Sequence, residues 1–140
     1  MKAYLTRRYL FSASHRLHRD GMPEEWNRET FGKCNNPHGH GHNYHLEVTV
    51  SGPVDPRTGM VCNLVDLDGF VTSEILERFG LQNLNTLPEF AIEVPTTENL
   101  CVAVYEILRR GFKKAHLENV RMEETMMNSF AYAGGAEIRE

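Results

Sequence analysis

The sequence predicts an α+β domain in which two amphipathic helices cover one face of a four-stranded antiparallel sheet. Residues 3–13 and 40–52, and later 119–125 and 129–138, are rich in β-branched and aromatic residues and alternate in polarity, as half-buried strands do. Two intervening segments carry apolar residues at helical spacing. The expected order is β-β-α-α-β-β, and the length of 140 residues suits a single domain, 1–140.

The first strand is imperfectly alternating and is expected to run on through residues 14–17. Between the first two strands, residues 18–33 are polar and contain glycine and proline. They predict a loop with one helical turn at Pro23–Trp26. A loop of this length in a small domain is more often functional than not.

The first helix is expected from Asn63 to Gly80, with Asp66 as a candidate N-cap and the glycine as its end. An Asp-Pro turn at residues 53–60 precedes it. After this turn, residues 60–62 are expected to pair back briefly as a strand.

The second helix is expected to open with Thr96 or Thr97 as its cap and to close near Gly111. A long mixed linker, residues 81–95, joins the two helices and is expected to lie over an active site or a subunit contact. A small sheet of this kind has exposed edges, and association can cover them, so a homo-oligomer is expected.

Composition narrows the classes of function. The net charge of −4 and a pI near 6.0 provide no basic field for nucleic acid or an anionic membrane. Local arginines or helix N-termini can still hold an anionic small substrate. Three widely spaced cysteines indicate free thiols and a reducing compartment. The chain shows no signal-peptide pattern and no apolar run of transmembrane length, so a cytoplasmic location is expected.

Most of the candidate chemistry lies in the segment Cys34–His45, which holds four of the seven histidines within twelve residues. In a strand, His40 and His42 point to the same face, about 6–7 Å apart, and both can reach one zinc ion. A third protein ligand would leave one position open, as in catalytic zinc sites. An isolated His-x-His is commonly surface decoration, but the added His38 and the nearby Cys34 favour a metal site.

Five motifs span nearly the whole chain in order: FSASHRL (Phe11–Leu17), FGKCNNPHGHGHNY (Phe31–Tyr44), DPRTGMVCNLVDL (Asp55–Leu67), PTTENL (Pro95–Leu100) and EET (Glu123–Thr125). Together they resemble the 6-pyruvoyl-tetrahydropterin synthase family. The resemblance implies the tunnelling fold, in which the sheets of a trimer close into a barrel and two trimers stack into a homohexamer. It also implies 7,8-dihydroneopterin triphosphate as substrate.

The resemblance implies a Zn²⁺ site formed by His15, His40 and His42, which leaves His38 outside. It matches Cys34 with the catalytic cysteine of the family. In the implied lyase reaction, zinc acidifies a C–H bond of the substrate side chain and the thiolate removes the proton. The neighbouring cation and an adjacent lysine are expected to lower the pKa of this thiol.

The resemblance also implies a pterin pocket. Glu124 matches the carboxylate that holds the pterin ring, and Thr97 and Glu98 are expected to line the same pocket. A carboxylate can accept both adjacent N–H donors of a pterin edge, as it does with arginine.

The chain departs from the family at Gly80-Leu81, where an Asp-His pair usually completes the proton relay. Neither residue here can transfer a proton. Three histidines are candidate substitutes: His18, His38 and His45. The departure leaves open a zinc- and pterin-binding homologue with altered or lost activity. A second alternative is 6-carboxy-tetrahydropterin synthase of queuosine synthesis, although the five residues between Cys34 and His40 resemble the longer spacing of the pyruvoyl enzymes.

Overall fold

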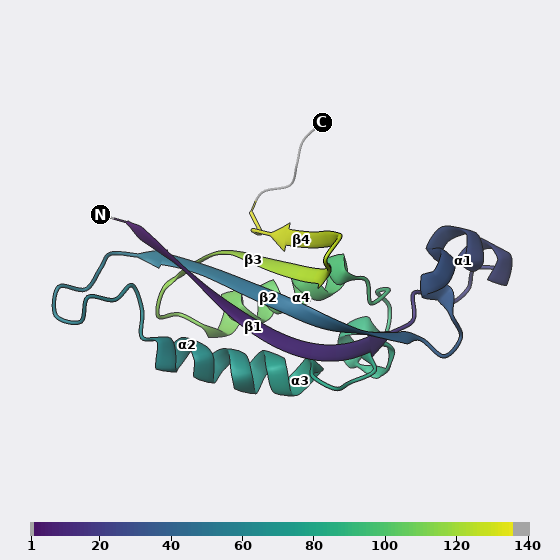
Figure 1. Cartoon of the computed structure of the whole chain (residues 1–140), viewed down its shortest axis with the longest axis horizontal. Helices are drawn as coiled ribbons and strands as arrows, with labels where there is room; N and C mark the ends of the chain where they lie inside the picture. Colours follow the sequence, from purple (N-terminus) through teal and green to yellow (C-terminus); the bar gives the residue numbers. More distant parts are fainter. Residues whose placement is uncertain (1, 136–140) are drawn as a thin grey trace.

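A four-stranded antiparallel sheet runs through the chain in sequence order, β1-β2-β3-β4. The computed structural model describes residues 2–135. The strands are β1 (Ala3–His15), β2 (His40–Gly52), β3 (His116–Thr125) and β4 (Asn128–Tyr132). The longest helices lie together on one face of this sheet (Figure 1). The expected α+β class is confirmed. The expected order is confirmed as well: two strands come first, two strands come last, and the long helices lie between them in the sequence.

The helices are α1 (Glu24–Phe31), α2 (Leu64–Val71), α3 (Glu77–Phe79) and α4 (Thr97–Gly111). A π-helical turn, Thr72–Leu76, joins α2 to α3, so the helical backbone is continuous from 64 to 79. This stretch and α4 are the two helices expected from the sequence. None of the helices in residues 2–135 is long and apolar enough to cross a membrane.

The core lies between the sheet and these two helical segments. Alternate side chains of β2, from Tyr44 to Val50, are fully buried. They pack against apolar side chains that recur at helical spacing and are also fully buried: Leu67, Val71, Ile75, Phe79, Leu100, Val104 and Leu108. Burial of this apolar surface is the main stabilising term, and it fixes the sheet relative to the helices.

The segment Glu24–Phe31 forms a full helix, α1, so the expected single turn is too short. One residue of this helix, Asn27, is completely buried. The amide of this side chain donates to the carbonyls of Arg19, Met22 and Pro23 and accepts from the N–H of Arg19 at 2.7 Å. These hydrogen bonds hold the helix against the preceding loop. The polar composition of residues 18–33 gave no sign of them, because a buried asparagine cannot be told from an exposed one by its sequence alone.

Two expectations around the first long helix are wrong. Residues 60–62 form no strand, because the N–H of Asp55 donates to the carbonyl of Met60 at 3.0 Å and closes a turn. The helix cap is Asn63, whose side chain accepts from the N–H of Val65 at 2.8 Å. Asp66 instead forms an ion pair with a lysine after α4.

The C-terminal strands also differ in length from the prediction. β3 begins at His116, three residues early, and β4 ends at Tyr132. Gly134 and Gly135 follow with positive φ angles of 62° and 95°, which end the extended backbone. The remainder of the expected final strand, 136–138, lies outside the described residues.

The predicted helix caps at Gly80 and Thr96 are confirmed. The residue in the left-handed conformation is, however, Leu81, with a φ of 58°. Its N–H donates to the carbonyl of Ser12 at 2.6 Å, and the N–H of Ser14 donates to the carbonyl of Gln82 at 2.9 Å. The linker between the helices is therefore held against the end of β1.

Candidate metal centre and substrate site

Three histidines meet where β1 ends and β2 begins. His15 is paired with His40 in the strand register, and His42 follows on the same face of β2. One ring nitrogen from each histidine lies within 4.8 Å of the others, and Nε2 of His15 is 3.1 Å from Nε2 of His40. Two nitrogens bound tetrahedrally to one zinc would lie about 3.3 Å apart, so the cluster has the dimensions of a metal site.

The histidine cluster fits a metal ion in its hydrogen bonding as well. Nδ1 of His15 donates to the carbonyl of Pro95 at 2.8 Å, which leaves the lone pair of Nε2 free to face the other histidines. Nε2 of His42 is buried and has no hydrogen-bond partner among residues 2–135. A buried, unpaired polar nitrogen is costly unless a ligand occupies the site.

Burial lowers the pKa of His15 and of His40, and the neighbouring His42 lowers the pKa of His40 further. Neutral imidazole is therefore favoured, and it is the form that binds metal. The close approach of the two strands depends on Gly39, which has a φ of 71°. A Cβ at this position would lie 2.9 Å from the carbonyl oxygen of His15.

Glu124, near the end of β3, lies beside the histidine cluster. Its Oε1 is 4.0 Å from Nε2 of His42, and its Oε2 accepts a hydrogen bond from the hydroxyl of Thr97. Glu124 and His42 line a cavity of about 300 Å³ at this end of the sheet. Glu98, on the first turn of α4, is exposed and does not line this cavity.

Cys34 lies in a short 3-10 helix, Gly32–Asn35, and is half-buried. Its carbonyl accepts from the N–H of Leu17 at 2.9 Å, which ties this loop to the segment after β1. Burial raises the pKa of the Cys34 thiol, and the charge of Glu124 raises it further. The adjacent Lys33 is exposed to solvent, and the lowering of this pKa by a bound cation stays a prediction.

Residues 4–135 match the family described as 6-pyruvoyl tetrahydropterin synthase. The chain belongs to this family. It is 46% identical to the 6-pyruvoyl tetrahydrobiopterin synthase of Drosophila melanogaster, over 94% of this chain and 80% of that protein. It is 44% identical to the Homo sapiens synthase, over 95% and 92% of the two chains. The solved 6-pyruvoyl tetrahydropterin synthase of Caenorhabditis elegans is similar in fold, with a TM-score of 0.91 and 37% identity over 96% and 97% of the chains.

The resemblance found in the sequence is thus confirmed, and with it the enzyme class, a phosphate-eliminating lyase. Of the site residues that the resemblance implied, the structure brings together the three histidines, Glu124 and Thr97. The electrostatic effect of Glu124 on Cys34 indicates that the thiol lies in the same neighbourhood. His38 is exposed and lies outside the histidine cluster.

The family's usual Asp-His pair would fall at Gly80-Leu81, at the end of α3. Leu81 is 89% exposed and lines an open hollow of about 550 Å³ together with His42. A Cβ at Gly80 would lie 2.4 Å from the carbonyl oxygen of Leu76. The backbone at this position therefore does not accept an aspartate without moving. Of the candidate substitutes, His45 lines the same cavity as Glu124.

Two asparagines near the site were not predicted. Asn35 donates its amide to the carbonyl of Leu17 at 2.7 Å and lies 3.1 Å from Nδ1 of His18. Asn85 brackets the backbone of Arg16, accepting from its N–H at 2.7 Å and donating to its carbonyl at 2.8 Å. The sequence offers one signal for these two residues, which is the presence of several asparagines around residues 35 and 85. It could not identify their hydrogen-bond partners, because those partners are distant in sequence.

Proposed function

We propose that this chain is a cytoplasmic, zinc-dependent lyase that converts 7,8-dihydroneopterin triphosphate to 6-pyruvoyl-tetrahydropterin with loss of triphosphate, a step of tetrahydrobiopterin synthesis. One observation carries the proposal: a cluster of three histidines lies 4.0 Å from a carboxylate that a threonine hydroxyl holds in place. Such a cluster suits a metal, and such a carboxylate suits the N–H donors of a pterin.

His15, His40 and His42 would hold the zinc. A bound zinc ion supplies Lewis-acid polarisation of the oxygens on the substrate side chain. Glu124 binds the amino group and the adjacent ring N–H of the pterin, and Thr97 keeps the carboxylate oriented for this contact.

Cys34 is the proposed base. Its Sγ, as thiolate, takes the proton from the side-chain carbon adjacent to the carbon that bears the triphosphate. The electron pair of that C–H bond forms a C=C bond, and the C–O bond to triphosphate breaks, so that triphosphate leaves with the electron pair of that C–O bond. The hydrogen bond from the N–H of Leu17 to the carbonyl of Cys34, which holds this loop two residues beyond His15, supports the role. With no proton-transferring group at Gly80-Leu81, His45 is the candidate to relay the proton onward, because it lines the cavity that holds Glu124.

The decisive experiment is turnover of 7,8-dihydroneopterin triphosphate by the zinc-loaded protein, with the products separated by chromatography. Release of triphosphate together with 6-pyruvoyl-tetrahydropterin is expected. Release of acetaldehyde would instead identify the 6-carboxy-tetrahydropterin synthase reaction. Tight pterin binding without any turnover would identify a homologue that has lost the activity.

We infer a homohexamer, a dimer of trimers, as the working assembly. In the sheet order β1-β2-β3-β4, β1 and β4 each pair on one side only. Leu10 and Tyr4 of β1 are 59% and 63% exposed, which suits burial against a second copy. Light scattering should give six times the 16.0 kDa of one chain. A monomer at working concentration would exclude this assembly.

A further inference from the structure

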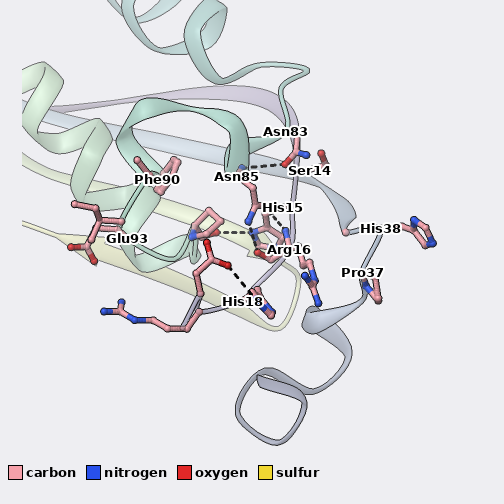
Figure 2. Close-up of a pocket in the computed structure, with 16 residues that line it drawn as sticks. Ser14, His15, Arg16, His18, Pro37, His38, Asn83, Asn85, Phe90 and Glu93 are labelled. Carbon is pink, nitrogen blue, oxygen red and sulfur yellow. Dashed lines mark hydrogen bonds and ion pairs between the residues drawn. The ribbon is translucent and has the colours of Figure 1, made fainter. Parts of the chain in front are cut away.

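Two cavities open beside the histidine cluster, and the smaller one has a wall residue with no role so far. The larger cavity, about 590 Å³, lies on the His15 side, and Arg16 and His18 belong to its wall (Figure 2). The smaller cavity, about 300 Å³, lies on the His42 side and contains Glu124, the proposed pterin anchor. A flat ring has two faces as well as a polar edge, so the rest of this smaller wall matters for binding.

The wall of the smaller cavity is almost entirely polar. As the described residues form it, it consists of histidine, asparagine, threonine and glutamate side chains, one glycine, and Met126. Met126 is 94% exposed, so it contributes almost nothing to the core of the folded chain. The apolar surface of this side chain is removed from water only when a ligand or another chain covers it.

The turn that carries Met126, between β3 and β4, is held by its own hydrogen bonds. The hydroxyl group of Thr125 donates to Oδ1 of Asn128 at 2.5 Å and accepts from the N–H of Met127 at 3.0 Å. Turns favour glycine, asparagine, aspartate and serine, and methionine has none of their backbone-bonding or conformational advantages. The local backbone therefore gives no reason for a methionine at position 126, whereas contact with a ligand supplies one.

The geometry of the anchor determines which part of a pterin remains to be covered. A carboxylate that accepts two adjacent N–H groups lies in the plane of the ring. The two faces of the ring then point toward other side chains than Glu124. Met126 follows Glu124 by two residues and lines the same cavity, so its side chain can lie over one face. The thioether of methionine is polarisable and makes favourable contacts with aromatic rings.

We propose that Met126 covers one face of the pterin ring and thereby determines the affinity for the ring. The inference rests on the proposed function, since it names a further binding residue for the same substrate. In this arrangement Glu124 binds the edge of the ring and Met126 binds its face. A polar side chain at position 126 would leave that face in contact with water.

Titration calorimetry of 7,8-dihydroneopterin, which has the ring without the phosphates, into the zinc-loaded protein tests this contact. Met126→Asn should weaken binding about three- to thirtyfold, because apolar burial and the sulfur contact are both lost. Met127→Asn is the matched control, because Met127 is 91% exposed on the same turn and, among the described residues, has no part in the cavity wall. It should leave the affinity within about twofold.

Met126→Leu separates an apolar contact from an altered turn. It keeps an apolar side chain of similar volume and should retain most of the affinity that Met126→Asn loses. Equal losses in these two variants would overturn the proposal, and so would equal affinities of Met126→Asn and Met127→Asn. Light scattering should give the parent's mass for every variant. Loss of the assembly in Met126→Asn would also overturn the proposal, since Met126 would then contact another chain.

Methyl NMR provides a readout that a purely structural role would not change. With isotopically labelled methionine methyl groups, the signal of Met126 should move upfield when 7,8-dihydroneopterin is added, because a group above an aromatic ring is shielded. The signal of Met127 should stay in place, and the two asparagine variants assign the two signals. An unmoved Met126 signal at saturating pterin would contradict the contact.

These binding measurements need no turnover, so they separate this inference from the proposed function. If Met126 contacts the ring but the parent protein does not turn over the pterin triphosphate, the contact stands and the function fails. If turnover is normal and Met126→Asn has the parent's KM, the function stands and the contact fails. If both hold, Met126→Asn should raise KM far more than it lowers kcat.

Discussion

The hydroxyl group of Thr97, the first residue of α4, donates a hydrogen bond to Oε2 of Glu124 near the end of β3. The other carboxylate oxygen lies 4.0 Å from Nε2 of His42. The start of a helix thus fixes a carboxylate beside the histidine cluster. Because Thr97 is 2% exposed and cannot swing away, Glu124 is oriented before any ligand arrives.

Glu124→Gln should weaken pterin binding several-fold to about a hundredfold, since one charged hydrogen bond contributes roughly 1.5–3 kcal/mol. Titration calorimetry with a pterin measures this, and zinc content should stay the same. Glu77→Gln is the matched control, because Glu77 is an exposed carboxylate on α3 and does not line the cavity that contains Glu124. Equal losses in the two variants would show that charge alone, and not the position of Glu124, matters.

Replacing His40 or His42 by alanine should remove about one equivalent of zinc per chain, because two histidines rarely hold zinc alone. His38→Ala should keep its zinc, since His38 is exposed and lies outside the histidine cluster. Metal analysis after dialysis measures both results. Loss of zinc in His38→Ala would contradict the ligand set.

Cys34→Ala should lower turnover by about 10²–10⁴, the usual range for losing one acid–base group. Its zinc content should match that of the parent protein. Cys62→Ala is the control, because Cys62 is a buried thiol in the hydrophobic core. If Cys34→Ala turns over substrate at the parent rate, the thiol is not the base.

Gly80→Asp with Leu81→His restores the family's usual pair and should raise activity if its absence limits the rate. The structure predicts a cost in stability, because a Cβ at Gly80 would lie 2.4 Å from the carbonyl oxygen of Leu76. We therefore expect the double variant to melt at a lower temperature than Leu81→His alone. Thermal melting and turnover must be measured on the same samples.

Leu81→Asn should stabilise the protein by up to about 1 kcal/mol. Leu81 has a φ of 58°, which is unfavourable for a residue with a bulky side chain and better tolerated by asparagine. Its side chain is 89% exposed, so little apolar burial is lost. Urea unfolding measures the change, and a decrease in stability would show that Leu81 packs against another part of the assembly.

The zinc-free protein should lose stability as the pH falls below about 6.5. Burial lowers the pKa of His15 and of His40 in the folded chain. The unfolded chain therefore binds protons more readily, and the free energy of unfolding rises with pH through this window. Urea midpoints of the chelator-treated protein between about pH 7.5 and about pH 5.5 should show this slope. His15→Gln should reduce it.

Local patterns in the sequence were sufficient for much of the fold. The two-residue period of β2 predicted its bounds, 40–52, and the shared face of His40 and His42. Side-chain capping also depends on neighbours in sequence, and Thr96 is a cap as predicted. These features follow from residues within one or two turns of each other, so the chain determines them without reference to the rest of the fold.

Only the tertiary structure decided what depends on distant partners. The spacing of the histidines favoured His38 beside His40 and His42, and only the family resemblance implied His15. The β1–β2 register places His15 directly opposite His40. In the same way, Asn85 reaches the backbone of Arg16 across 69 residues, and both residues line one cavity beside His15. A register or a cavity wall is set by the packing of whole elements, and no short stretch of sequence carries that information.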